Sequence, residues 1–209
     1  DHTPKPLLKV GGKPLITWHL ERLAAAGFKE VVINHAHLGE QIEAALGDGS
    51  QWGLRIRYSP EKIALETAGG IANALPLLGD APFLVVNGDV FTDVDFGVLR
   101  LIEPDVAHLV MVNNPPQHSN GDLVLNHDRM STEGSGKLTF SGVGIYAPSL
   151  FAGITRGEAA KLAPLLKDAM ARGLVSGSHH RGGWHDIGTP ERLQALDSQL
   201  LISPQKLTS

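Results

Sequence analysis

The sequence predicts an α/β protein with a doubly wound, mostly parallel, Rossmann-like sheet and a small β insertion. Short apolar runs of strand length alternate with longer amphipathic segments along most of the 209-residue chain, which is the pattern of strands joined by crossover helices. The run at 83–86 is apolar throughout, as expected for a strand that is covered on both faces. A polar, irregular stretch at 115–137 interrupts this alternation.

The N-terminal third contributes two helices and two strands to this prediction. A helix is expected over 14–26, because proline suits the first helical turn and Gly27 ends the apolar repeat. A short apolar strand over 31–34 and an amphipathic helix over 39–46 follow. Residues 54–58 alternate between apolar and polar side chains, as in a strand with one face in solvent.

The middle of the chain begins with glycines that predict a loop leading into a helix, together spanning 67–75. The buried strand over 83–86 comes next, and residues 96–102 have the spacing of a short helix. A second fully apolar strand is expected over 108–112.

The last third opens with a long strand over 137–146, whose glycines mark bends or close approach of a ligand. A helix over 161–172 and strands over 174–179 and 183–187 follow. The final helix, over 190–201, begins with a capping threonine and a proline at its first position.

We expect residues 1–209 to form a single domain, with the β insertion over about 113–146 acting as a substrate lid. A doubly wound fold normally begins with a strand and a glycine-rich turn that wraps phosphate. Neither precedes the first predicted helix, so the expectation includes such a strand and loop upstream of Asp1.

Composition narrows the classes of function. Hydrophobic residues make up 42% of the chain, which suits a globular protein. The net charge of −4 comes without any basic cluster, which argues against nucleic-acid binding. The absence of cysteine excludes disulfides and thiolate zinc sites and fits a cytoplasmic location. No apolar run reaches membrane-spanning length, and no signal-peptide pattern opens the chain, so no membrane partner is expected.

Two aspartates follow predicted strands. Asp89 ends the apolar run that starts at Phe83, and Asp186 lies at the end of the strand over 183–187. Carboxylates at the C-terminal ends of strands point into the crevice where open α/β sheets bind ligands. Such a pair could share one Mg²⁺ with substrate phosphates, although each alone could simply end a strand in a polar turn.

Other motifs are weaker. Lys5 lies between two prolines that restrict the backbone, so its ammonium could act as a fixed charge for phosphate, or could be an ordinary exposed lysine. The glycines of 66–70 precede a helix and could let a base or phosphate approach backbone amides. Paired histidines lack convergent further ligands for zinc. Neither a Gly-x-Ser-x-Gly elbow nor a Walker lysine motif occurs.

Taken in order, the motifs resemble those of the sugar-1-phosphate nucleotidylyltransferases over nearly the whole chain. The matching segments are 4–16, 66–70, 87–89, 140–146 and 184–190. Within that family the chain is most similar to the short N-acetylmuramate-1-phosphate uridylyltransferases of bacterial cell-wall recycling. The resemblance implies the nucleotide-diphospho-sugar transferase type of fold. The family's leading glycine-rich signature and its Glu-Lys-Pro sugar-phosphate motif are not recognisable here.

The resemblance also implies roles for individual residues. Catalysis would depend on three charged residues, two of which would bind Mg²⁺: Lys5, Asp89 and Asp186. The residues expected on the nucleotide side are Lys5, Glu66, Gly69, Gly70 and Asn87. Those expected on the sugar side are Gly121, Asp122, Gly142 and Lys161. The implied reaction is attack by a sugar 1-phosphate, expected to be N-acetylmuramate 1-phosphate, on a nucleoside triphosphate, expected to be UTP, with release of pyrophosphate.

Two alternatives stay open from the sequence. One is a guanylyltransferase for mannose or heptose 1-phosphate, and the other is a non-catalytic nucleotide-sugar-binding protein. A muramate carries acyl and lactyl groups, which call for a roomy and partly cationic pocket. His118, Arg129 and Arg181 are the candidates for its cationic side chains.

Overall fold

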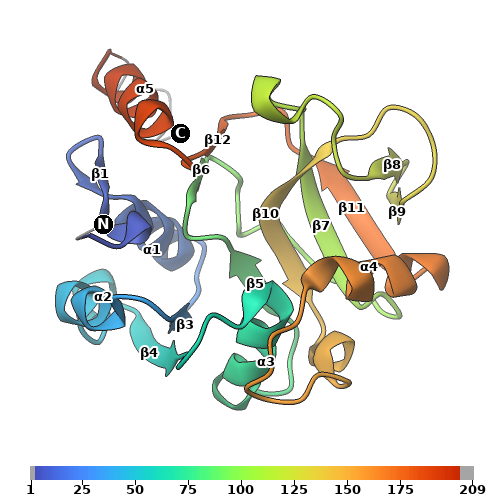
Figure 1. Ribbon diagram of the computed structural model, residues 1–209, viewed down its shortest axis with the longest axis horizontal. Coiled ribbons are helices and arrows are strands. Elements are labelled where there is room, and N and C mark those ends of the chain that lie inside the picture. Colours follow the sequence, from blue (N-terminus) through green and yellow to red (C-terminus); the bar gives the residue numbers. More distant parts are fainter. Residues whose placement is uncertain (1–2, 203–209) are drawn as a thin grey trace.

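The structure is a computed structural model that describes residues 3–202. Its α-helices are α1 (Leu15–Ala25), α2 (Gly39–Leu46), α3 (Glu66–Leu78), α4 (Leu162–Ala171) and α5 (Pro190–Ile202). Its strands are β1 (Lys9–Val10), β2 (Lys13–Pro14), β3 (Glu30–His35), β4 (Arg55–Pro60), β5 (Phe83–Val86), β6 (Val90–Thr92), β7 (Ala107–Val112), β8 (Val124–Asn126), β9 (Arg129–Ser131), β10 (Thr139–Tyr146), β11 (Val175–His179) and β12 (Trp184–Asp186). Figure 1 shows their arrangement.

A six-stranded sheet forms the centre, in the order β5-β10-β7-β11-β9-β8. Strands β5, β7, β11 and β8 run in one direction, while β10 and β9 run in the other. The predicted α/β class is confirmed, but the sheet is mixed where a mostly parallel one was expected. The reason is that β10 returns from the insertion and pairs antiparallel with β5 and β7 on either side.

A second, two-stranded sheet pairs β3 and β4 in parallel. Within residues 3–202, β3 is hydrogen-bonded only to β4, and β5 only to β10. Helix α3 packs against β3 and β4 and also contributes Ala68, Ile71 and Ala72 to the core over the central sheet. The two sheets therefore share one covering helix without sharing a strand pair.

Helices cover both faces, as a doubly wound fold requires. One face of the central sheet packs against α3 and α4 through a large apolar core that includes Leu109, Met111 and Val175. On the opposite side, α1 contributes to the core around Val110 and Val143 through Leu23. Helices α1 and α2 pack together against the β3–β4 sheet. Burial of these faces supplies the main driving force for the fold.

Two predicted elements differ from the structure. Residues 96–102 form turns and irregular chain rather than a helix, because the carboxylate of Asp95 accepts a hydrogen bond from the Gly97 amide at 2.9 Å and the Arg100 guanidinium donates to the Gly97 carbonyl at 2.7 Å. Such local side-chain bonds compete with helix formation. The glycines expected in a loop lie within α3, which already begins at Glu66.

The insertion contains the β8–β9 hairpin, which joins the central sheet where β9 pairs with β11 at Arg129 and Ser176. Strand β12 lies within the strand predicted over 183–187, and it pairs beside the central sheet with β6, a short strand that the sequence did not predict. None of the described helices is long and apolar enough to cross a membrane.

Candidate active site

The two aspartates singled out from the sequence lie on neighbouring segments. Asp89 sits in the turn between β5 and β6, and Asp186 is the last residue of β12. Pairing of β12 with β6 sets Asp186 opposite Val90, and the Ile187 amide donates to the Asp89 carbonyl at 2.8 Å. The β6–β12 ladder thus brings together two carboxylates that are far apart in the sequence.

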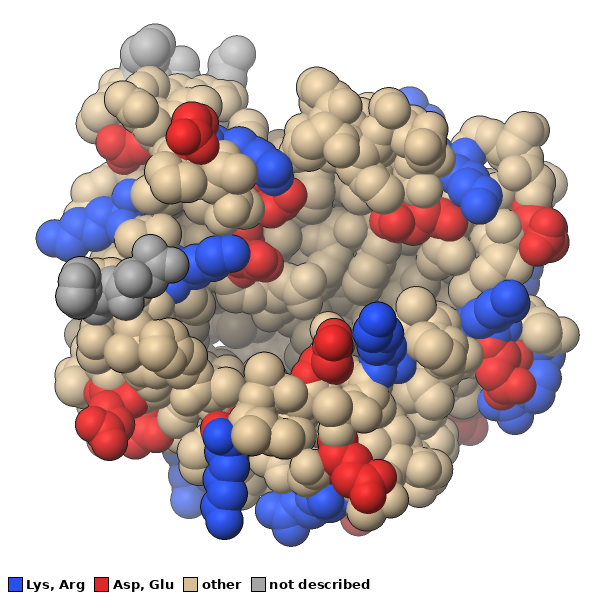
Figure 2. Space-filling model, in the orientation of Figure 1, with Lys and Arg blue, Asp and Glu red and all other residues tan. Residues whose placement is uncertain are grey.

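Both carboxylates line one cavity of about 270 Å³, which we call the acidic cavity. Other residues of its wall include Asn87, His118, Phe140, Gly142 and Trp184. Figure 2 shows that this face of the molecule is hollowed at its centre, with acidic and basic side chains along the rim. Both aspartates singled out from the sequence therefore line one hollow.

The acidic cavity suits a hard divalent cation. Carboxylate oxygens are the ligands that Mg²⁺ prefers, and this ion commonly takes only one or two of them beside waters and substrate phosphates. Asp89 is half-buried and lines this cavity, so its oxygens are accessible from it. Among the described residues no group of three or more histidine, aspartate or glutamate side chains converges as a metal site, so the substrate would have to complete the shell.

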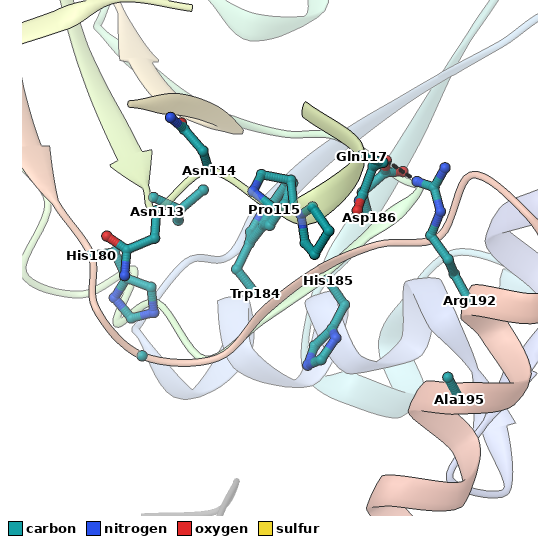
Figure 3. Close-up of a pocket in the computed structure, with 13 residues that line it drawn as sticks. Asn113, Asn114, Pro115, Gln117, His180, Trp184, His185, Asp186, Arg192 and Ala195 are labelled. Carbon is teal, nitrogen blue, oxygen red and sulfur yellow. Dashed lines mark hydrogen bonds and ion pairs between the residues drawn. The ribbon is translucent and has the colours of Figure 1, made fainter. Parts of the chain in front are cut away.

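Asp186 has a partner that the sequence interpretation missed. The guanidinium of Arg192, on α5, forms an ion pair with Asp186 and extends towards it across the adjoining pocket (Figure 3). Each of these two side chains is 34% exposed. The sequence did offer a signal for this pair: Arg192 lies in the first turn of the helix that follows Asp186, where a cation is unfavourable unless it has a partner.

A larger cavity of about 930 Å³ adjoins the acidic cavity, and we call it the sugar-side cavity. Asn87 and Phe140 line both cavities. Several residues predicted from the sequence line the larger one: Glu66, Asn87, Gly121, Asp122 and Lys161. The structure therefore brings predicted nucleotide-side and sugar-side residues into one continuous hollow next to the aspartates.

Gly142 has a specific reason to be glycine. Its φ is +80°, and a Cβ at this position would lie 2.7 Å from Nδ2 of Asn87. The backbone N–H of Asn87 also donates to the Gly142 carbonyl at 3.0 Å. Gly142 thus lets the side chain of Asn87 lie against β10, where the two cavities meet.

The three cationic side chains proposed for the muramate pocket lie in different parts of the structure. His118 lines the acidic cavity, and its Nε2–H donates to Oδ1 of Asp122 at 2.8 Å. Arg129 is a correction to the sequence interpretation, because it lines a different pocket and pairs with Asp105 at 2.7 Å. Hydrogen bonding from Arg129 lowers the pKa of Asp105. Arg181 is exposed and lines neither the acidic nor the sugar-side cavity.

The remaining nucleotide-side candidates lie around the N-terminus of α3. A Cβ on Gly69 would meet the Glu158 carbonyl at 2.4 Å, and one on Gly70 would meet Nδ2 of Asn34 at 2.7 Å. The groups that lie close to these two glycines therefore belong to the protein, not to a ligand. Glu66 has a φ of +60°, a conformation that is uncommon outside glycine and concentrates at functional positions.

Lys5 is exposed and belongs to a short 3-10 helix, Lys5–Leu7. The next residue, Pro6, lies 3.3 Å from where a Cβ of Gly88 would be, which sets this segment beside the turn that carries Asp89. The lysine is thus on the chain segment next to the acidic cavity, although it is not part of the wall of that cavity.

A third cavity, of about 390 Å³, is also lined by Asp186, together with His180, His185 and Arg192 (Figure 3). We call it the outer cavity. Burial lowers the pKa of the His185 imidazole, while nearby Asp93 partly raises it. His180 hydrogen-bonds to Asp93 through Nε2 at 2.6 Å. Polar side chains therefore line the second cavity that Asp186 borders.

The chain belongs to the nucleotidyl transferase family, whose model matches residues 1–115. Over 203 residues it is 58% identical to the N-acetylmuramate alpha-1-phosphate uridylyltransferase of Neisseria meningitidis serogroup B, covering 93% of this chain and 88% of that protein. The enzyme of the same name from Caulobacter vibrioides is 34% identical, over 94% and 88% of the two chains.

Relatives with lower identity have other activities in their names. A mannose-1-phosphate guanylyltransferase of Mycobacterium tuberculosis is 32% identical over 90% of this chain, which spans 56% of that protein. Among solved structures, a putative glucose-1-phosphate thymidylyltransferase from Bacillus anthracis superposes with a TM-score of 0.80 at 18% identity, covering 94% of this chain and 86% of that one. At that identity the likeness establishes the fold alone.

Proposed function

We propose that this chain transfers a uridylyl group from UTP to N-acetylmuramate α-1-phosphate and releases pyrophosphate. The observation that carries the proposal is the 58% identity to the Neisseria enzyme of that name over 93% of this chain. The structure adds support, because the two aspartates share a cavity that opens into a large sugar-side cavity.

The chemistry asks the protein mainly to align two anions and to neutralise their charge. A phosphate oxygen of the sugar phosphate attacks the α-phosphorus of UTP, and pyrophosphate leaves. Asp89 and Asp186 would hold a Mg²⁺ ion, which would offset the negative charge on the phosphate oxygens. Lys5 would add a cation from the neighbouring segment. The attacking group is already ionised, so no protein nucleophile is required.

The sugar-side cavity supplies the polar groups for the acceptor. Asp122 is fixed there, because its Oδ2 accepts a hydrogen bond from the Phe140 amide at 2.8 Å while its Oδ1 accepts one from His118. Lys161 lines the same cavity and would pair with the sugar phosphate or with the lactyl carboxylate. Lys161→Ala is expected to raise the KM for the sugar phosphate by roughly tenfold, with the KM for UTP unchanged, since about 1.4 kcal/mol is lost with one charged contact.

The direct test follows pyrophosphate release from each nucleoside triphosphate with a panel of sugar 1-phosphates. UTP with N-acetylmuramate 1-phosphate should give the highest kcat/KM. Asp89→Asn and Asp186→Asn preserve side-chain volume and should each lower turnover on the order of 10³-fold or more, with unchanged melting temperature. Near-normal turnover of either variant at saturating Mg²⁺ would show that the carboxylates have another role.

The second candidate is a guanylyltransferase for mannose 1-phosphate, which the Mycobacterium tuberculosis relative favours at 32% identity. The same panel separates the two, because the guanylyltransferase hypothesis requires GTP to be preferred over UTP. Absence of pyrophosphate with every pair of substrates would instead support a non-catalytic nucleotide-sugar-binding protein.

The proposal includes a single domain over residues 1–209, with a sheet that has room for one further strand. In residues 3–202, β3 and β5 each have one edge without a partner strand, and α3 packs across the region that they share. An apolar strand between them would join the two sheets into one. We also propose a cytoplasmic location, which the absence of cysteine supports.

A further inference from the structure

The Asp186 carboxylate forms part of the wall between two cavities. It lines both the acidic cavity, which it shares with Asp89, and the outer cavity. Arg192 lines only the outer cavity. Its Nη1 donates to Oδ2 of Asp186 (Figure 3), so the guanidinium meets the carboxylate in the outer cavity, which Asp89 does not line.

Helix stability does not explain the position of Arg192. The Arg192 amide donates to Oγ1 of Thr189 at 3.3 Å, which caps α5 and places Arg192 in the first helical turn. The positive end of the helix dipole lies there, so a cation is disfavoured and an acidic residue such as Glu191 is favoured. The contact with Asp186 is the interaction that offsets this cost.

Gly188 provides the space for the pair. A Cβ at this position would lie 3.1 Å from Nη1 of Arg192 and 3.1 Å from Oδ1 of Asp186. Gly188 does not have a positive φ that would itself call for glycine. The missing side chain therefore matters for the fit of the guanidinium against the carboxylate and not for the backbone conformation.

We propose that Arg192 is a positioning residue for Asp186. It holds Oδ2 from the outer cavity and thereby leaves Oδ1 available to a divalent cation in the acidic cavity. This inference rests on the proposed role of Asp89 and Asp186 as cation ligands. Carboxylates that bind metal ions are themselves oriented by outer hydrogen-bond partners, and loss of such a partner typically costs 10- to 100-fold in metal affinity or activity.

The test measures Mn²⁺ binding to the whole chain by titration calorimetry without substrates, because Mn²⁺ shares the preference of Mg²⁺ for oxygen ligands. Arg192→Ala should raise the Kd for Mn²⁺ by roughly tenfold or more. Arg192→Lys should recover only part of that loss, since an ammonium keeps the charge but lacks the planar fork. Gly188→Ala keeps both charges and disturbs only their fit, so it should raise the Kd by a smaller factor, about threefold.

The matched control is Arg172→Ala. Arg172 forms an ion pair with Asp168 on α4, with 3.2 Å between Nε and Oδ2, and neither residue lines the acidic or the outer cavity. Removing it should leave the Kd for Mn²⁺ unchanged. Melting temperatures in EDTA identify any variant that has failed to fold.

Asp186→Asn separates failure of this inference from failure of the proposed function. If that variant binds Mn²⁺ as tightly as the unmodified chain, the assignment of Asp186 as a cation ligand is wrong. If Asp186→Asn loses binding while Arg192→Ala and Gly188→Ala keep full affinity, only the positioning role is wrong. Tighter binding by Arg192→Ala would overturn it too, because the guanidinium would then be competing with the cation.

Discussion

Acid should destabilise this protein through His19, a buried histidine of α1. Its Nε2 hydrogen-bonds to the Val90 carbonyl at 2.8 Å, one residue beyond Asp89. Its Nδ1 is buried without a partner in the described part of the chain. Burial lowers the pKa of His19 from 6.5 to about 4, although the bond to the Val90 carbonyl opposes this shift. The folded protein therefore keeps this imidazole neutral at a pH where the unfolded chain protonates it.

The sign and size of the effect follow from linkage. Between pH 6.5 and pH 4 the unfolded state binds a proton that the folded state excludes, so the free energy of unfolding falls as the pH is lowered. The pKa difference from 6.5 to about 4 corresponds to about 3 kcal/mol over the whole window, at ~1.36 kcal/mol per unit. About 1 kcal/mol of this should already be lost at pH 5.5.

Urea unfolding at several pH values between 7.5 and 4.5 measures this contribution of His19 to the free energy of unfolding. The reference is His19→Gln, whose side-chain amide can donate to the Val90 carbonyl from the position of Nε2 but does not titrate. The natural protein should lose about 2 to 3 kcal/mol more than the variant across that range. Equal losses in the two proteins would refute the argument, since other titrating groups are common to both.

Three further substitutions test the packing of the site and of the core. Gly142→Ala should raise the KM for UTP several-fold and lower the free energy of unfolding by roughly 1–3 kcal/mol, because it strains a φ of +80° and pushes a methyl group against Asn87. The control is Gly79→Ala, at a φ of +79° with no neighbour within 4 Å, which should lower stability without changing the KM. Phe151→Ala should cost about 3–5 kcal/mol by urea unfolding, since this ring is 1% exposed within the core under α3; a loss below 1 kcal/mol would contradict its place in that core. Trp184→Phe removes the donor to a β10 carbonyl at 2.8 Å and should cost about 1 kcal/mol, with unchanged stability counting against that bond.

Local patterns in the sequence were enough to predict many of the elements. The helix over 39–46 and the strand over 83–86 have the same bounds in the structure as in the prediction, because periodicity and flanking glycine act within a few residues. The predicted helix over 96–102 failed for an equally local reason that periodicity does not reveal: the carboxylate of Asp95 accepts a hydrogen bond from nearby backbone, and the guanidinium of Arg100 donates one to it.

The sequence by itself determined which carboxylates to examine, since Asp89 and Asp186 each follow a strand in an α/β pattern. Only the tertiary structure decided what surrounds them. The register between β6 and β12 brings the two aspartates to one cavity, and the start of α5 sets Arg192 against Asp186. The structure also shows that Arg129 lies outside the site, where it pairs with Asp105. The physical reason is that strand register and helix placement follow from packing of the whole core, which short sequence patterns do not encode.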